Sequence, residues 1–187
     1  MRRLFLMAGL MTALGLAVVA ASAAAANFGG TWSLDKTKSQ SLSPRMQGAD
    51  KVTWTITQDD KTISIDQKIE GGQPAGGGGG GGGTGGGGGM GGGRPPAGPV
   101  AYKLDGSEAT SDVTFGPATG KQTLKATWAG DALELSRKTT FTTEQGDRTT
   151  NNTQKLSLSG DGKVLTAVVH SEGRGGPTDS TLVFNKQ

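Results

Sequence analysis

The chain has 187 residues, of which 34 are glycine and none is cysteine, so its fold must rest on a hydrophobic core without disulfide bonds. The formal net charge is +3, but two of the 19 basic residues, Arg2 and Arg3, belong to a leader-like segment; without them 17 basic residues face 16 acidic ones, which leaves +1. This balance excludes a nucleic-acid partner, because a surface that binds phosphates needs a basic cluster.

The first 26 residues have the composition of a secretory signal peptide. Arg2 and Arg3 form a basic region, residues 4–20 an apolar run, and residues 21–26 a series of small residues that a signal peptidase accepts. We therefore expect an exported protein, periplasmic or extracellular, whose mature chain starts near Asn27 or at Ala24. A membrane anchor is the alternative, disfavoured because the apolar run is short and no basic residues follow it.

From residue 27 onward, apolar and polar residues alternate with the period of two that is typical of half-buried strands. The alternating positions are Trp32 and Leu34; Val52, Trp54 and Ile56; Ile63 and Ile65; Tyr102 and Leu104; Val113 and Phe115; Leu124, Ala126 and Trp128; Leu133 and Leu135; Leu156 and Leu158; Leu165, Ala167 and Val169; and Leu182 and Phe184. Asp- and Gly-rich segments that suit tight hairpins, such as 58–61, 129–131 and 159–163, join these runs. No segment has a persuasive helical period. We predict one all-β domain, residues 27–187: a single antiparallel up-and-down β-barrel of about 8–10 strands, because closure removes exposed sheet edges.

A glycine-rich tract, residues 71–99, interrupts the strand pattern. Between Gly71 and Gly93, 18 of the 23 residues are glycine. Poly-glycine has no side chain to bury and loses the most entropy on ordering, so we predict a disordered insertion between two strands. It is not a phosphate-binding loop, because Arg94, Pro95 and Pro96 follow in place of a lysine, a hydroxyl residue and a helix. A flap or an attachment arm is the functional alternative.

The two ends of the mature chain resemble the calycin superfamily, which includes lipocalins and fatty-acid-binding proteins. Residues 27–39 read NFGGTWSLDKTKS, in which Gly30 and Trp32 match the Gly-x-Trp motif of the first calycin strand, while Phe28 and Leu34 fit the longer fatty-acid-binding form. The ending STLVFNKQ, residues 180–187, resembles the last strand, and the mature pattern is also similar to exported bacterial proteins with a Gly-Thr-Trp-x-Leu-Asp start. The resemblance implies a barrel closed at one end by Gly30 and Trp32, with a small apolar molecule inside.

This chain departs from the fatty-acid-binding proteins at two places. Those proteins hold the ligand carboxylate with an Arg-x-Tyr pair on the last strand, where this chain has Leu182 and Phe184. The segment 35–50 is also short for a helical lid. Fatty-acid binding therefore does not follow from the resemblance.

Strand parity suggests a different polar group for a ligand. If Leu133 and Leu135 face inward, so does Arg137. If Leu156 and Leu158 face inward, the same side also carries Gln154, Asn152, Thr150 and Arg148. An apolar floor that includes Trp54, Leu133 and Phe184, below a wall with Arg137 and Arg148, would suit an amphipathic or anionic ligand. The alternative is that the long hairpins run past the barrel, which would leave both arginines in solvent.

The sequence predicts no catalytic residues, no metal site and no cofactor. His170 is the only histidine, and Glu172 two residues later is too little to make a metal site. No serine stands in a Gly-x-Ser-x-Gly turn. We therefore expect a non-catalytic protein.

Three function classes remain. The first is a barrel that binds a small amphipathic or apolar molecule, and the second is a filled barrel that serves as an envelope scaffold or a protein-interaction module. An enzyme ranks last. An outer-membrane barrel is disfavoured, since aromatic residues make up only 5% of the chain. An interior cavity of several hundred Å³ would favour binding, and a solid interior would favour the scaffold.

Overall fold

The computed structural model describes residues 26–71, 98–115, 118–143, 146–173 and 175–187. The predicted signal peptide and most of the glycine-rich tract lie outside these residues. Each of the ten alternating runs forms a strand, and one short helix is added. The elements are β1 (Gly30–Leu34), α1 (Pro44–Gly48), β2 (Lys51–Gln58), β3 (Thr62–Glu70), β4 (Val100–Lys103), β5 (Ala109–Phe115), β6 (Ala118–Ala129), β7 (Ala132–Thr143), β8 (Gly146–Leu158), β9 (Val164–Gly173) and β10 (Gly176–Lys186).

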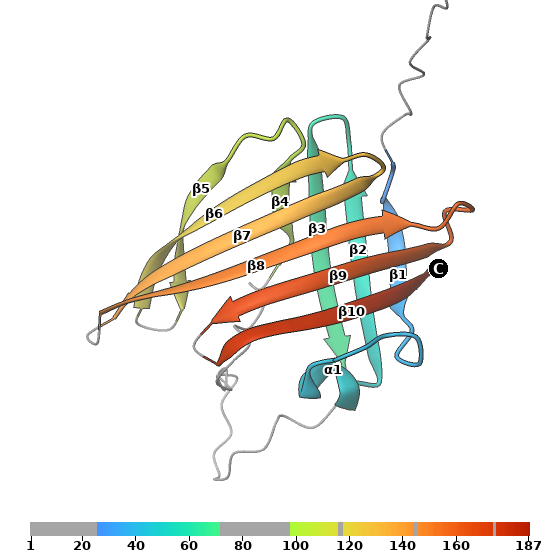
Figure 1. Ribbon diagram of the computed structural model, residues 1–187, viewed down its shortest axis with the longest axis horizontal. Coiled ribbons are helices and arrows are strands. Elements are labelled where there is room, and N and C mark those ends of the chain that lie inside the picture. The colour runs from blue at the N-terminus through green and yellow to red at the C-terminus, as the bar shows by residue number, and fades with distance from the viewer. Residues whose placement is uncertain (1–25, 72–97, 116–117, 144–145, 174) are drawn as a thin grey trace, which may run out of the picture.

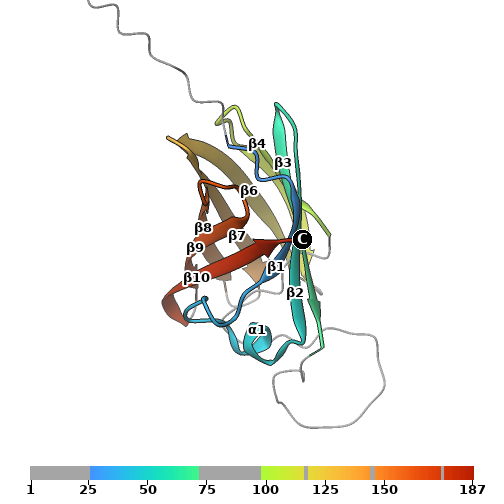
Figure 2. The ribbon, with the colours of Figure 1, turned by 90° about the vertical axis from the view of Figure 1, so that its right-hand side faces the viewer.

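The ten strands form one antiparallel sheet in the order β4-β3-β2-β1-β10-β9-β8-β7-β6-β5. Every pair is consecutive in the chain except β1 with β10, where Trp32 lies opposite Lys186 and Leu34 opposite Phe184. Figures 1 and 2 show β1–β4 as one wall and β6–β10 as the facing wall, with the strands of the two walls crossing. The predicted up-and-down β-barrel is confirmed. It is nearly closed, because the hydrogen-bonded ladder ends at β4 on one side and at β5 on the other.

Hairpin turns form where Asp and Gly were predicted to place them. In the β2–β3 turn, one carboxylate oxygen of Asp59 accepts hydrogen bonds from the backbone N–H groups of Lys61 and Thr62, at 2.8 and 2.7 Å. The two-residue turn between β6 and β7 places Gly130 at φ +65°, a conformation that glycine adopts without strain.

One helical turn, α1, interrupts the connection between β1 and β2. The Ser43 hydroxyl accepts a hydrogen bond from the backbone N–H of Met46, and Pro44 begins the turn. Leu42 and Met46 are partly buried against the core. Five residues are too few to show a helical period, which explains why the alternation-based prediction missed α1. The segment contributes a short cover over one end of the barrel (Figure 2).

The core lies between the two walls and draws on nearly every strand. Its largest fully buried side chains are Trp32, Trp54, Phe28, Phe184, Ile63, Leu133, Leu135, Leu156, Leu165 and Val52. Trp54 and Phe184 pack ring against ring with centroids 4.4 Å apart, which joins the β2 wall to the β10 wall. Phe28 stacks on Trp128 at 6.1 Å, between the start of the described chain and the end of β6.

Candidate functional site

The inner face of the barrel has two parts that differ in burial. The part we call the filled half holds inward side chains with no exposed surface: Trp32, Leu133, Leu135, Leu156, Leu165 and Phe184. The part we call the open half continues the same inward parity with half-buried side chains: Gln67, Arg137, Asn152, Gln154, Val169 and Ser171. Inward side chains that keep partial exposure show that solvent reaches the inner surface there.

Arg137 lies on β7 at the start of the open half. It follows Leu135 by two residues and is in register with Leu124 of β6 and Asn152 of β8. Within the described residues, no hydrogen bond or ion pair to its guanidinium is found. A half-buried guanidinium normally has an anionic partner, because removing an unpaired charge from water costs free energy.

Tyr102 of β4 lies within the electrostatic reach of Arg137. Burial raises the pKa of the Tyr102 hydroxyl, and the positive charge of Arg137 opposes that rise. The side chain is only 4% exposed. The positive charge of Arg137 on β7 therefore acts on the hydroxyl of Tyr102, which lies on β4 where that strand approaches β6.

Amides and a hydroxyl extend the polar surface from Arg137 across β8 and β9. The side-chain amide of Asn152 donates to the Ser171 hydroxyl at 2.7 Å, and the Gln154 amide donates to the Asn152 oxygen at 3.0 Å. This chain of hydrogen bonds fixes the orientation of Asn152. Asn152 and Gln154 are half-buried and hydrogen-bonded on the face that strand parity assigned to the interior, and their part in a ligand site stays a prediction.

Two buried N–H donors on the β2–β3 wall have no acceptor among the described residues: Nε1 of Trp54 and Nε2 of Gln67. The two residues are a directly opposed cross-strand pair. Buried donors without a partner are rare in folded proteins, since each one forfeits its hydrogen bonds to water. The sequence analysis placed Tyr102 on a strand but did not assign it or Gln67 to the site, although the alternation of Ile63, Ile65 and Gln67 along β3 was sufficient to place Gln67 inward.

The residues predicted to line a ligand site are placed as follows. Trp54, Leu133 and Phe184 are 2% exposed or less and belong to the core. Arg137 is half-buried on the inner face, whereas Arg148 and Thr150, nearer the start of β8, are exposed. Arg148 is in register with Phe141, at the end of the β7–β8 hairpin that extends beyond the core. At this end of the hairpin the side chains face solvent, as the alternative in the sequence analysis proposed for Arg148.

Gly30 and Trp32 lie on β1, and Trp32 belongs to the filled half. Trp32 is fully buried, donates from Nε1 to the carbonyl oxygen of Phe28 at 2.9 Å, and carries the Lys186 ammonium 5.2 Å from its ring centroid. Gly30 has φ +140°, and a Cβ there would lie 3.0 Å from the Lys186 side chain. Glycine is therefore favoured at this position beside the buried tryptophan.

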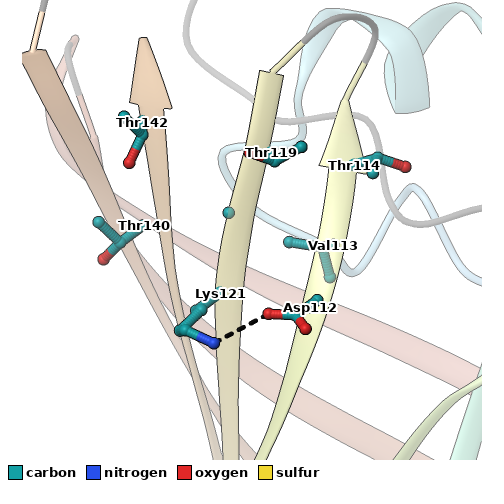
Figure 3. Close-up of a pocket in the computed structure, with 8 residues that line it drawn as sticks. Asp112, Val113, Thr114, Thr119, Lys121, Thr140 and Thr142 are labelled. Atoms are coloured by element: carbon teal, nitrogen blue, oxygen red, sulfur yellow. Dashed lines mark hydrogen bonds and ion pairs between the residues drawn. The ribbon is translucent and has the colours of Figure 1, made fainter.

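Two hollows lie apart from the core. One, of about 510 Å³, is lined on β5–β7 by Asp112, Val113, Thr114, Thr119, Gly120, Lys121, Thr140 and Thr142. Figure 3 shows its exposed ion pair, in which Lys121 lies 2.9 Å from Asp112. The other, of about 420 Å³, is lined by Glu108, Thr123, Lys125, Ser136, Arg137, Lys138, Asn151, Asn152 and Thr153. Neither hollow is lined by a buried core residue.

His170 lies on the outer surface, opposite Asp179 of β10. Its Nδ1 is 2.6 Å from the Asp179 carboxylate and its Nε2 is 3.5 Å from Glu172. Hydrogen bonds to Asp179 and Glu172 raise the pKa of the imidazole. No cluster of three or more His, Cys, Asp or Glu side chains suited to a metal ion occurs among the described residues. No helix in the described part of the chain has the length and apolarity of a membrane span.

Comparison with known proteins gives one structural likeness. No family model matches the chain, and no curated protein matches it. Among solved structures, zebrafish ileal bile acid-binding protein in complex with cholic acid is similar, with a TM-score of 0.42 and 16% sequence identity over 86% of this chain and 98% of that one. At these values the likeness assigns neither a family nor a ligand to this chain.

Proposed function

We propose that this chain is an exported, non-catalytic binding protein whose barrel takes a small amphipathic molecule with an anionic group in the open half. The observation that carries the proposal is Arg137, which is half-buried on the inner face without a carboxylate partner in the described structure. An anionic ligand group would supply the missing partner.

The surroundings of Arg137 support this choice of ligand. Leu124 and Leu135 are buried apolar neighbours of Arg137, while the Asn152 amide is held in place by Ser171. Convergent polar groups beside apolar walls are typical of small-molecule sites. The anionic head group of a ligand would contact Arg137 and Asn152, and its apolar body would lie against the inner wall.

The test is a titration of fatty acids, retinoids and other anionic amphiphiles, followed by tryptophan fluorescence. Wild-type protein is expected to bind at least one member of the panel, and Arg137→Ala is expected to weaken that binding about tenfold or more, the effect of losing a charge-assisted hydrogen bond. Lys138→Ala is the matched control, because Lys138 is the next residue on β7 and is exposed. Equal loss in both variants would contradict the proposed site.

The filled half favours a second function, a scaffold without a ligand. Side chains such as Trp32, Leu133 and Phe184 leave no exposed surface at that end of the interior. Absence of any binder, together with a solution structure that places Arg137 in bulk water, would select the scaffold.

Export has a separate test, the mass of the protein recovered from the periplasm or the medium. We expect a chain that starts at Asn27 or Ala24. Recovery of the full-length chain in the membrane fraction would contradict cleavage and favour an anchor.

A further inference from the structure

We propose that two copies of this chain associate through the free edge of β5, with Val113 on the two-fold axis between them. The strands of the two barrels would then form one continuous antiparallel ladder across the axis. No residue of β5 belongs to the proposed ligand site, so dimerisation and ligand binding can be tested separately.

β5 is hydrogen-bonded to a neighbouring strand on one side only. Its seven residues pair with β6, from Ala109 opposite Leu124 to Phe115 opposite Ala118. The sheet ends at β5, and among the described residues no backbone hydrogen bond joins its other side to another strand or loop. Alternate residues of an antiparallel strand direct their N–H and C=O groups to opposite sides. The edge of β5 therefore presents unpaired donors and acceptors.

The sequence of β5 lacks the features that usually protect a free edge. Natural proteins protect such edges with short strands, prolines, bulges or lysines. β4, at the other end of the ladder, has four residues and ends in Lys103. β5 has seven residues, ATSDVTF, without proline, glycine or lysine. Its one charged side chain, Asp112, lies 2.9 Å from the Lys121 ammonium of β6, which reduces the repulsion between two such edges.

The side chains of β5 are complementary to those of a second β5 when Val113 lies on the axis. A two-fold axis pairs identical strands antiparallel, so that Thr114 lies opposite Asp112 of the second copy, and the same pair recurs across the axis. With Asp112 on the axis, two carboxylates would be directly opposed, which is destabilising.

Threonine opposite aspartate is a pair that the chain already uses. Thr142 of β7 lies directly opposite Asp147 of β8, and its hydroxyl donates to that carboxylate at 2.9 Å. Thr114 is exposed, and no hydrogen bond to its hydroxyl is found in the described part of the chain. Thr110, which would face the same carboxylate in a pairing shifted by two residues, already contacts the Thr123 hydroxyl at 3.2 Å. The pairing about Val113 therefore gives the carboxylate an uncommitted donor.

The surface beside this edge has room for a second strand. The hollow of about 510 Å³ is lined by Asp112, Val113 and Thr114, which follow one another along β5 in Figure 3. The outward side chain of a partner strand can therefore lie beside Thr114 without displacing a packed side chain.

The first measurement is the mass of the protein in solution. With Val113 on the axis, residues 111–115 of the two copies overlap and provide about four to six backbone hydrogen bonds. Such a small contact predicts a weak dimer. Sedimentation equilibrium over about 10 μM to 1 mM should give an average mass that rises from one chain toward two. The mass of one chain at every concentration would overturn the dimer.

Single-cysteine variants test the position of the axis. The chain has no cysteine, so each variant carries one thiol. Under mild oxidation Val113→Cys should form a disulfide dimer faster than Ser111→Cys, Asp112→Cys or Thr114→Cys, because directly opposed residues lie within disulfide distance. Val168→Cys is the control, an exposed position on β9. A maximum at any position other than 113, or rates equal to that of the control, would overturn the proposed pairing.

Charges placed at Thr114 test its contact with Asp112 of the second copy. Thr114→Lys should strengthen association and Thr114→Asp should weaken it, each by about 2- to 30-fold, since the pair occurs twice in the dimer. Thr127→Lys and Thr127→Asp are the matched controls, because Thr127 is exposed on β6 and away from the edge. Thermal melts should show all four variants folded. Equal effects of the same charge at the two positions would contradict the Thr114–Asp112 pair.

Discussion

The filled and open halves of the interior are built on the same strands, yet they differ in what their inward residues meet. On β7, Leu135 has no exposed surface, and Arg137, two residues later on the same face, is half-buried. On β8, the same change occurs between Leu156 and Gln154. The difference shows that strand alternation sets the face of a residue, while the opposite wall sets its burial. The site lies where the inward side chains of β7 and β8 change from fully buried to half-buried.

Replacing Trp32 with Ala should give the largest effect on the filled half. The side chain is fully buried, so truncation should lower the free energy of unfolding by about 3–5 kcal/mol, measured by urea denaturation. Val168→Ala is the control, because Val168 is 48% exposed and its truncation should cost under about 0.5 kcal/mol. Equal effects of the two truncations would remove the basis for a filled half.

A pair of truncations on one rung of the sheet tests the boundary between the halves. Leu135 of β7 and Val169 of β9 flank Gln154 in register, and only Leu135 is fully buried. Leu135→Ala should cost about 2–5 kcal/mol, as core truncations do. Val169→Ala should cost about 1 kcal/mol, because it removes fewer and less buried methyl groups. A Val169 effect as large as that of Leu135 would mean that the open half is packed.

Shortening the glycine-rich tract should have a smaller effect. We expect replacement of residues 71–93 by a four- or five-residue turn to leave stability unchanged or to raise it by under about 1 kcal/mol, because loop-closure entropy varies slowly with length. Thermal melts of the two proteins provide the measurement. A marked loss of folding would mean that the open half depends on this segment.

The smallest effect concerns His170, on the outer surface. The Asp179 and Glu172 carboxylates raise its pKa, so their stabilising effect is fully present below the unfolded pKa of about 6.5 and is lost as pH rises through the folded pKa. NMR titration of this single histidine should give a pKa above the ordinary value. Asp179→Asn should lower it, and a pKa unchanged by that substitution would show that the close pair does not persist in solution.

The fold was predictable because every strand repeats the same local pattern. Alternating apolar pairs indicate the inward face of each strand, as Val52 with Trp54 and Leu165 with Ala167 do. The Asp-Gly segments indicate the turns. The open side of the ladder, between β4 and β5, was not predictable, because hydrogen-bonded and unpaired edges have the same alternation.

The candidate site was predictable only in part. Strand parity placed Arg137 and Asn152 on the inner face. It also predicted an inward Arg148, which is exposed, because alternation does not show where the opposite wall of the barrel ends. The unpartnered N–H groups of Trp54 and Gln67 depend on the distance and angle of every nearby acceptor. That information belongs to tertiary packing, which no local pattern encodes.

The end of the hydrogen-bonded ladder at β4 and β5 has a mechanical consequence. In a fully closed barrel, any increase in circumference must break backbone hydrogen bonds along a whole strand pair. Here β4 and β6 lie close to each other across that line, and no ladder hydrogen bonds join the described strands there. The distance between β4 and β6 can therefore increase without loss of a ladder hydrogen bond. Because Tyr102 lies on β4, such a movement would change its distance from Arg137.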